Sequence, residues 1–332
     1  MQLSIIVINF KSAQLVVDCL RSISNQNSNL TCEIFVVDND SKDNSNQKIR
    51  NIFPEVKYLQ MNYNAGFARA NNEAIKNSNG DVVLLLNADT IIENSAIERC
   101  YNSFINSQYI ACGVQLLNVD RTPQISGNYI MKGGINYLLP LPFLGNALKF
   151  FAFLFRVEKP NVPDAKGTVE VDWINGAFLM VKKSAIDIAG LLDEDFFLYA
   201  EETEWCSRLR KVGKLCIYGD INVVHLQGEI TNETFGSSGK GYYNLFDKKG
   251  LQIMLSNLVR IRKEFGVAWF LIILSAYVFE IPVFFIGVVI SKLFLSKKYS
   301  LSQVKKYAAN IFEIVKLSLI IVRNQPYFYK VL

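Results

Sequence analysis

The sequence has few of the residues that build metal clusters or disulfide frameworks. Among its 332 residues there is one histidine, His225, and the six cysteines are scattered without a Cys-x-x-Cys pair. This spacing argues against a zinc site and against a disulfide scaffold. Several cysteines lie in apolar surroundings, as buried reduced thiols do.

The N-terminus lacks the features of an export signal. The first ten residues, MQLSIIVINF, contain neither a basic segment nor a cleavage site, and they already have the pattern of a strand. We therefore expect no signal peptide and a main body in the cytosol.

Charged residues are scarce and unevenly distributed. They make up 20% of the sequence, whereas half of the residues are hydrophobic. From Leu251 onward there are 11 Lys or Arg against 3 Asp or Glu, and the rest of the chain has 24 against 27. A basic, apolar C-terminal quarter favours contact with an anionic membrane surface. Because the basic residues flank apolar runs instead of forming one stripe, we expect no nucleic-acid partner.

The longest apolar run is Ala268–Ile290, 23 residues interrupted by Glu280 and Pro282. A helix of this length reaches about 34 Å, enough to cross a bilayer, although a carboxylate at mid-depth costs roughly 2.5–3.5 kcal/mol. Basic residues flank both sides, so the positive-inside rule gives no orientation. These residues are Arg260, Arg262 and Lys263 before the run and Lys292, Lys297 and Lys298 after it.

Two further segments bear on membrane contact. Tyr307–Val322 is a second, amphipathic stretch, and Leu138–Phe155 is apolar but broken by two prolines and a glycine. For the C-terminal stretches we expect helices embedded in, or lying on, the cytoplasmic leaflet. A true span and a buried helical hairpin of a soluble domain are the alternatives. Leu138–Phe155 is expected to be a loop or short helix that touches lipid, or an internal lid.

Short apolar runs alternate with stretches of helical spacing over the first 90 residues. This order predicts an α/β fold with a doubly wound, mostly parallel, Rossmann-like sheet. In such sheets ligands bind beyond the C-terminal strand ends, where Phe10, Asp38 and Asp89 are expected. The predicted strands are Leu3–Ile8, Cys32–Val37, Val56–Gln60 and Val82–Leu86, and the predicted helices are Ala13–Ser24 and Asn64–Ile75.

The triplet Asn87-Ala88-Asp89 follows the apolar strand Val82–Leu86 and places a carboxylate at its end. An Asx residue there often does no more than start a turn. His225 likewise follows an apolar run, and a lone histidine in that position is often structural. One carboxylate and one imidazole can also bind a divalent cation, with diphosphate oxygens at the other coordination positions.

Three other segments carry candidate residues. Asp38 can accept a hydrogen bond from the imide N–H of uracil or thymine, or it can simply form a turn. Asn64, Gly66 and Arg69 stand near a helix start, where a diphosphate is favoured, or they mark a plain helix N-terminus. In Asp193–Trp205 six acids lie in an aromatic frame. They suit either the dipole of a helix beginning near Glu201 or a general base beside a pocket.

Together these segments resemble the GT-A glycosyltransferases of the family-two type, most closely the bacterial rhamnosyl- and galactofuranosyl-transferase-like members. The resemblance covers roughly residues 3–230, and its motifs occur in the order and spacing of the family. They are SIIVINF, VVDNDS, NYNAGFARANN, LLLNADT, VDWINGAFLMV, LLDEDFFLYAEETEWCSRLRKVG and VVHLQG.

The resemblance implies inverting transfer of a sugar from a nucleotide diphosphate donor, with Mg²⁺ or Mn²⁺ as cofactor. Asp89 would be the last carboxylate of the metal motif and His225 the second protein ligand, so that the cation neutralises the departing diphosphate. Glu202 would be the base that takes the proton of the acceptor hydroxyl. The other implied contacts are Ile8, Phe10 and Asp38 with the nucleobase, Asn64 and Arg69 with ribose and diphosphate, and Trp173, Gly176 and Glu201 with the sugars.

The sequence departs from the family pattern at two positions. Asn87 replaces the first Asp of the metal motif, which puts one metal contact in doubt. Glu202 replaces an Asp and is one methylene longer, so the base can be Glu201, Glu202 or Glu204.

The sequence thus predicts a metal-dependent hexosyltransferase. It would move a rhamnose-like, galactofuranose-like or other hexose from a dTDP- or UDP-sugar to a lipid-linked or cell-surface polysaccharide precursor. Residues 1–240 would form the GT-A nucleotide-sugar transferase domain and residues 241–332 a membrane-association region on the cytoplasmic face. A non-catalytic sugar- or lipid-binding scaffold is one alternative. A sugar-nucleotide nucleotidyltransferase is another, although the turn Val7–Lys11 lacks the glycine-rich loop of that class.

Overall fold

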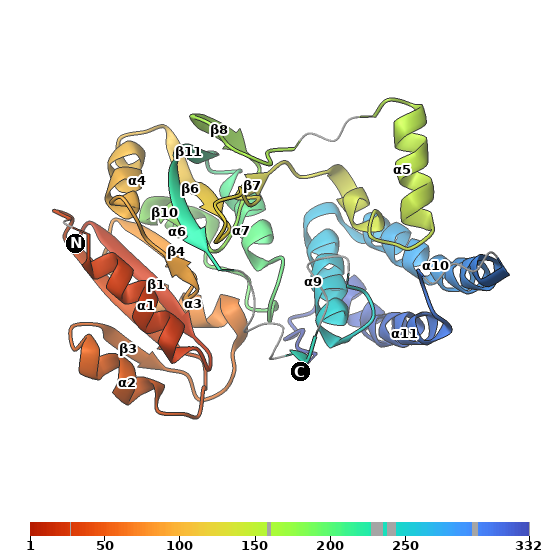
Figure 1. Ribbon diagram of the computed structural model, residues 1–332, viewed down its shortest axis with the longest axis horizontal. Helices are drawn as coiled ribbons and strands as arrows, with labels where there is room; N and C mark the ends of the chain where they lie inside the picture. The colour runs from red at the N-terminus through yellow and green to blue at the C-terminus, as the bar shows by residue number, and fades with distance from the viewer. Residues whose placement is uncertain (27, 158–160, 227–234, 238–243, 294–297, 332) are drawn as a thin grey trace. The chain divides into compact units, whose positions relative to one another are not determined.

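A computed structural model of the protein describes residues 1–26, 28–157, 161–226, 235–237, 244–293 and 298–331. The chain divides into two compact units, whose elements are labelled in Figure 1. The first comprises Met1–Tyr129, Pro160–Phe197 and Glu201–Ile230, and the second Ile130–Lys159, Leu198–Ala200 and Thr231–Leu332. The last two residues of the motif VVHLQG, and Lys297 of the basic flank, lie outside the described residues.

The first unit is built on one mixed sheet, with strand order β3-β2-β1-β4-β10-β6-β11-β5 and with β8 paired to β11. Strands β1 to β4 run parallel, and β10 lies antiparallel between β4 and β6. A separate antiparallel pair joins β7 and β9. The strands are β1 (Leu3–Asn9), β2 (Cys32–Asp38), β3 (Lys57–Gln60), β4 (Val82–Leu86), β5 (Thr90–Ile91), β6 (Tyr109–Leu117), β7 (Gly127–Asn128), β8 (Thr168–Val171), β9 (Trp173–Ile174), β10 (Phe178–Lys182) and β11 (Lys214–His225).

Helices cover both faces of this sheet, because successive strand residues point to opposite sides. Ile5 and Val7 of β1 pack into one core with α1 and α4, while Ile6 packs into a second core with α3, α6 and α7. The doubly wound, mostly parallel sheet predicted from the sequence is therefore confirmed. The helices of this unit are α1 (Ala13–Ser24), α2 (Ser45–Ile52), α3 (Gly66–Asn77), α4 (Ala96–Ile105), α6 (Lys183–Ala189) and α7 (Glu201–Leu209).

The second unit is helical. Its central helix α9 buries nearly all of its length, from Lys249 to Ile261, and α10 and α11 pack against it. Its elements are the 3-10 segment η1 (Lys132–Leu138) and helices α5 (Leu144–Leu154), α9 (Lys248–Phe265), α10 (Val267–Leu293) and α11 (Leu301–Arg323). Among the described residues, α10 is the one helix that is long and apolar enough to cross a membrane.

Residues 130–159 were placed in the first domain by the sequence analysis, but their contacts assign them to the unit of the C-terminal helices. The reason is local. The rings of Phe143 and Phe284 lie 6.1 Å apart, and Trp269 packs against Gly133. The functional roles predicted for residues 1–240 and 241–332 remain predictions.

Candidate active site

Asn87, Asp89 and His225 meet at the C-terminal end of β4. The two-residue strand β5 begins directly after Asp89 and pairs with the end of β11, with Thr90 opposite His225. The Nε2 atom of His225 therefore lies 3.3 Å from Oδ1 of Asp89 and 3.4 Å from Nδ2 of Asn87. We call these three side chains the Asp89–His225 corner.

Gln124 fixes the protonation pattern of the histidine ring. Its side-chain nitrogen donates to the backbone oxygen of His225 at 2.7 Å and to Oδ1 of Asn118 at 2.9 Å. The amide oxygen of Gln124 must then face Nδ1 of His225, 3.0 Å away, and because this oxygen can only accept, Nδ1 carries the proton. The neutral ring with this tautomer has its lone pair on Nε2, the atom that lies beside Asp89 and Asn87, and a metal-ligating histidine binds its cation through such an atom.

The corner suits a divalent cation as a pair of ligands. Two donor atoms 3.3 Å apart can share one cation at bond lengths of about 2.0–2.2 Å. Among the described residues, no group of three or more His, Cys, Asp or Glu side chains is placed to hold a metal. The remaining coordination positions would then belong to a ligand, as expected for a cation that is bound together with a diphosphate.

A short chain of contacts connects this corner to α7. The backbone N–H of Asn87 donates to the carbonyl of Ala177 at 3.1 Å. The neighbouring Gly176 stands beside α7, since a Cβ added there would lie 3.7 Å from Cβ of Glu202 and 3.5 Å from the ring of Phe67. The metal motif and the acidic helix, more than 100 residues apart in sequence, thus contact the same turn.

The three glutamates at the start of α7 have different surroundings. Glu204 is committed to a bidentate ion pair with Arg208, with both N···O distances at 2.8 Å. Glu201 is 3% exposed, and burial, together with the charge of Glu202, raises the pKa of its carboxyl well above the usual range. Its Oε2 is a buried atom without a hydrogen-bond partner in the described part of the chain. Glu202 is the half-buried member beside Gly176.

The two residues before α7 have unusual backbone angles. Tyr199 and Ala200 have φ values of 70° and 69°, in the left-handed region that residues with a side chain rarely adopt. Such conformations cost free energy and are concentrated at functional sites.

Asp38 lies at the end of β2, opposite Asn9 of β1, and is almost fully buried. Its carboxylate accepts hydrogen bonds from Asn9 (2.6 Å), the backbone of Ser41 (2.8 Å) and Gln60 (2.9 Å). Burial raises the pKa of this carboxyl, but the hydrogen bonds outweigh burial and hold the pKa below its usual range. Asp38 is therefore an ionised acceptor at the sheet edge, although much of its capacity is used within the fold.

The loop before α3 is tied to the end of β2. Asn39 donates to Oδ1 of Asn64 at 3.1 Å and accepts from the backbone of Ala65 at 2.7 Å. Gly66 has φ of 73°, and a Cβ there would stand 2.1 Å from the carbonyl oxygen of Phe197, so glycine is required. Arg69 donates to the carbonyl of Glu194 at 2.9 Å and to the hydroxyl of Tyr63 at 3.2 Å.

The remaining residues predicted to contact the donor lie in or directly after strands of the same unit. Ile8, at the end of β1, and Phe10, just beyond it, are half-buried, and Trp173 lies in β9 opposite Asn128. The parallel register places Asn9 opposite Asp38 and Val7 opposite Leu86, so the nucleobase candidates and the corner share one edge of the sheet. The nucleobase, diphosphate and sugar contacts of these residues stay predictions.

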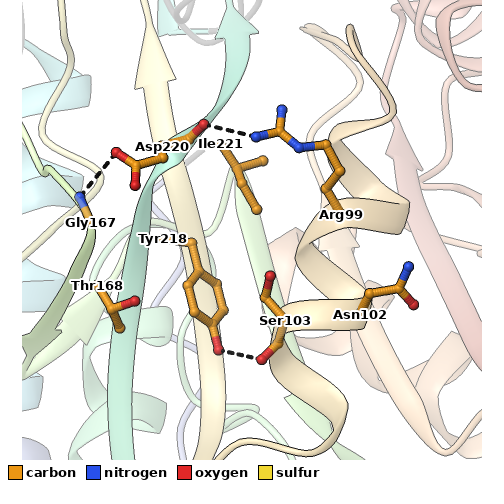
Figure 2. A pocket seen from close by; sticks show the side chains of 8 residues that line it. All are labelled: Arg99, Asn102, Ser103, Gly167, Thr168, Tyr218, Asp220 and Ile221. Carbon is orange, nitrogen blue, oxygen red and sulfur yellow. Dashed lines mark hydrogen bonds between the residues drawn. The ribbon is translucent and has the colours of Figure 1, made fainter.

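A surface pocket of about 530 Å³ lies elsewhere on the first unit, between α4, β8 and β11 (Figure 2). Arg99 donates to the carbonyl of Asp220, Gly167 to its carboxylate, and Tyr218 to the carbonyl of Ser103. None of the predicted site residues lines this pocket. It is therefore separate from the candidate site.

Comparison with known proteins identifies the class. Residues 4–168, about half of the chain, match the family model described as Glycosyl transferase family 2. The chain belongs to this family, and the family resemblance of its motifs is confirmed.

Several curated proteins are similar to the chain. It is 29% identical over 219 residues to the low-salt glycan biosynthesis hexosyltransferase Agl10 of Haloferax volcanii. This match covers 63% of this chain and 62% of that protein. It is 25% identical over 204 residues to the dTDP-rhamnosyl transferase RfbF of Shigella flexneri, covering 60% and 61%. It is 24% identical over 200 residues to an N-acetylglucosaminyl-diphospho-decaprenol L-rhamnosyltransferase of Mycobacterium tuberculosis, covering 56% and 63%. The matches span a little over three fifths of the relatives' length.

Solved structures show the same fold. TarS 1–349 of S. aureus in complex with UDP matches with a TM-score of 0.51 at 16% identity, over 80% of this chain and 66% of that one. The mannosyltransferase PcManGT of Pyrobaculum calidifontis, in complex with GDP-Man and Mn²⁺, matches with a TM-score of 0.52 at 12% identity, over 96% and 87%. The predicted GT-A fold is confirmed.

Proposed function

We propose that the chain is an inverting, cation-dependent glycosyltransferase that moves a hexose from a nucleotide diphosphate donor to a hydroxyl of a lipid-linked or cell-surface glycan precursor. The observation that carries the proposal is the Asp89–His225 corner, where Gln124 contacts Nδ1 of the imidazole and Nε2 lies 3.3 Å from the carboxylate. A pair of this kind is useful for holding a cation against a diphosphate.

Each residue then has a defined task. A bound Mg²⁺ or Mn²⁺ would neutralise the charge of the departing diphosphate. Glu202 takes the proton of the acceptor hydroxyl, because Glu204 is held by Arg208 and burial favours the protonated form of Glu201. A protonated Glu201 also avoids a second negative charge beside the base. Gly176, whose missing side chain leaves room next to Glu202, would admit the sugar.

The remaining tasks concern the donor. Ile8, Phe10 and Asp38 would contact the nucleobase, Asn64 and Arg69 the ribose and diphosphate, and Trp173 the sugars.

The names of the relatives support the substrate classes without fixing them. One relative uses a dTDP-rhamnosyl donor and another acts on a decaprenol-linked acceptor, by their names. We therefore propose a dTDP- or UDP-linked rhamnose-like, galactofuranose-like or other hexose as donor. A lipid-linked acceptor on the cytoplasmic face of the membrane fits the basic, apolar C-terminal helices.

Two substitutions test the proposal. Asp89→Ala should abolish transfer and remove the Mn²⁺-dependent thermal shift caused by a nucleotide sugar, because the cation loses its carboxylate. Glu202→Gln should lower the transfer rate by about 10²–10⁴-fold while the thermal shift is kept. The measurements are transfer of radiolabelled sugar and thermal unfolding with a panel of nucleotide sugars, with and without Mn²⁺.

Asp187→Ala is the matched control, since Asp187 is an exposed aspartate of α6 outside the candidate site. Full activity in Glu202→Gln would refute the assignment of the base. If no nucleotide sugar shifts the unfolding temperature of the wild type, the non-catalytic scaffold is favoured instead. Release of pyrophosphate from a nucleoside triphosphate and a sugar phosphate would indicate the nucleotidyltransferase.

A further inference from the structure

Helix α10 has two apolar faces. One is buried within the second unit, through residues such as Phe270, Tyr277, Phe284 and Val288. The other is exposed and runs along the helix as successive pairs of large apolar residues, with Ser275 and Pro282 exposed between the first three pairs. It consists of Leu271, Ile272, Val278, Phe279, Phe285, Ile286, Val289, Ile290 and Leu293. A surface helix of a soluble protein carries polar residues on its outer side, so this outer face is suited to apolar surroundings.

The charged residue in the middle of α10 is not on the outer face. Glu280 is fully buried, and its two carboxylate oxygens accept hydrogen bonds from the backbone N–H groups of Phe143 (2.8 Å) and Leu144 (3.0 Å). These groups begin α5, and a carboxylate there satisfies free donors and matches the positive end of the helix dipole. Glu280 therefore fixes the start of α5 on α10.

Beyond its first turn, α5 is mostly exposed to solvent. Gly145 is its one buried residue, packed against the carbonyls of Leu138 and Leu139. The far end exposes a run of large apolar side chains, with Phe153 at 83% and Phe155 at 71% exposure. We call Phe150, Phe151, Phe153, Leu154 and Phe155 the aromatic end of α5. Aromatic and aliphatic residues of this kind enter the boundary between lipid headgroups and acyl chains.

The packing of α11 decides how α10 can meet lipid. The hydroxyl of Tyr307 donates to the carbonyl of Tyr277 at 2.9 Å, and its ring lies 6.1 Å from that of Phe284. Tyr307 is thus level with the middle of α10. Its neighbours Lys305 and Lys306 are exposed. If α10 crossed a bilayer, both lysines would stand near the centre of the hydrocarbon, where charged side chains are strongly disfavoured.

We propose that the outer face of α10 and the aromatic end of α5 form one docking surface that lies in the plane of an anionic lipid surface without crossing it. Charge complementarity selects this partner. The second unit contains 18 Lys or Arg against 6 Asp or Glu, and the first 17 against 24. Exposed basic residues occur on, or a few residues beyond, the helices that carry or adjoin the surface. They are Lys149, Arg156, Lys292, Lys298, Lys305 and Lys306.

This inference deepens the proposed membrane location but does not rest on sugar transfer. Vesicle binding is measured without nucleotide sugar, so a protein that binds vesicles and transfers no sugar would refute only the proposed function. A protein that transfers sugar to a water-soluble acceptor and ignores vesicles would refute only the docking surface.

The binding test uses the full chain and preformed vesicles of phosphatidylcholine with 30% phosphatidylglycerol. In density-gradient flotation, the wild type should rise with these vesicles. It should rise poorly with vesicles of pure phosphatidylcholine. The double variant Phe153→Ser/Phe155→Ser should lose at least tenfold in vesicle affinity. Ile188→Ser is the matched control, because Ile188 is 74% exposed on α6 of the first unit, and it should bind as the wild type does.

A labelling test distinguishes lying from crossing. Cys32 is the one exposed cysteine, so Lys263→Cys and Lys298→Cys are placed singly in a Cys32→Ser background, flanking the two ends of α10. A membrane-impermeant maleimide added to vesicle-bound protein should label both positions without detergent. Labelling of only one position until detergent is added would show a spanning helix.

Two further results would also overturn the proposal. One is vesicle binding of Phe153→Ser/Phe155→Ser at the wild-type level. The other is a wild type that does not float but forms dimers by light scattering, with the double variant monomeric. In that case a second copy of the chain covers the surface.

Discussion

At the scale of single residues, the chain's one histidine owes its chemistry to a neighbour that carries no charge. Gln124 accepts from Nδ1 of His225 and donates to the backbone oxygen of the same residue. Such an outer partner sets the orientation and basicity of a ligating imidazole. Gln124 is thus a positioning residue that acts through His225.

Replacing Gln124 should weaken cation binding. Gln124→Leu removes the acceptor of the Nδ1 proton, so the ring is no longer held with Nε2 at Asp89. We expect Mn²⁺ affinity in the presence of UDP to fall by about 10–100-fold, measured by electron paramagnetic resonance of free Mn²⁺. Asn118→Ala is the control, because it removes one partner of the Gln124 amide and leaves the contact with His225. Unchanged Mn²⁺ affinity in Gln124→Leu would contradict this role.

Glu201 makes the stability of the protein depend on pH. Burial, reinforced by the charge of Glu202, raises the pKa of its carboxyl in the folded state. Below the pKa of the unfolded chain, about 4.5, both states are protonated and there is no penalty. As pH rises above that value the unfolded chain releases the proton while the folded protein retains it, so stability falls.

Glu201→Gln removes this penalty, since an amide does not ionise. The variant should unfold at a higher temperature than the wild type at pH 8, by about 2–4 °C for a change of ~1 kcal/mol, and the difference should vanish near pH 4.5. Circular dichroism melts across this range measure it. Glu204→Gln should have the opposite sign because it breaks the pair with Arg208. A difference for Glu201→Gln that is constant with pH would contradict the explanation.

The sequence predicted Asp89, His225 and Glu202 because each lies in a motif next to a strand or helix end. The structure brings Asp89 and His225 together and connects both to Glu202 through the turn at Gly176 and Ala177. The sequence did not predict Gln124, which lies 101 residues from His225. A polar residue in a loop carries no local signal, since its role depends on a tertiary contact.

At the scale of elements, the backbone before α7 stands out. Tyr199 and Ala200 both have left-handed angles, which cost an L-residue roughly 1–2 kcal/mol. Glu201 and Glu202 follow directly, so the strained pair sets where the acidic helix begins and how its first turn is presented.

Relieving this strain should stabilise the protein. Ala200→Gly lets the backbone adopt φ of 69° without a Cβ, which should outweigh the greater entropy of glycine in the unfolded chain by about 0.5–1 kcal/mol. Chemical unfolding in urea measures the difference. Ala74→Gly is the matched control, because Ala74 is buried as Ala200 is and lies in the interior of α3, and the same change there should destabilise by about 1 kcal/mol. If both variants lose the same free energy of unfolding, the explanation by backbone strain is wrong.

The parallel strands were predictable as elements because β-branched apolar runs alternate with helical spacing. The antiparallel insertion of β10 between β4 and β6 was not. Phe178–Lys182 is buried on both faces, and a run of this kind has the same pattern whichever way it points. Direction comes from the long connection that precedes it, which sequence periodicity does not report.

At the scale of the whole molecule, the two units defined by contacts differ more in net charge than the two parts of the sequence before and after Leu251. Counting from Leu251 places a basic excess at the C-terminus, but Lys132, Lys149 and Arg156 belong to the same basic unit. The sequence could not assign them, because they are joined to the C-terminal helices by packing and by the hydrogen bonds of Glu280.

The pairing of β5 with β11 has a consequence for the order of assembly. The two sides of the Asp89–His225 corner are separated by 136 positions and are joined through a strand of only two residues. Pairings between distant segments form late in folding, whereas β1 to β4 are complete within the first 86 residues. During synthesis from the N-terminus, the edge that carries Asp38 can fold on an unfinished chain, but the corner cannot. Cation affinity would therefore report that the first unit has completed its folding.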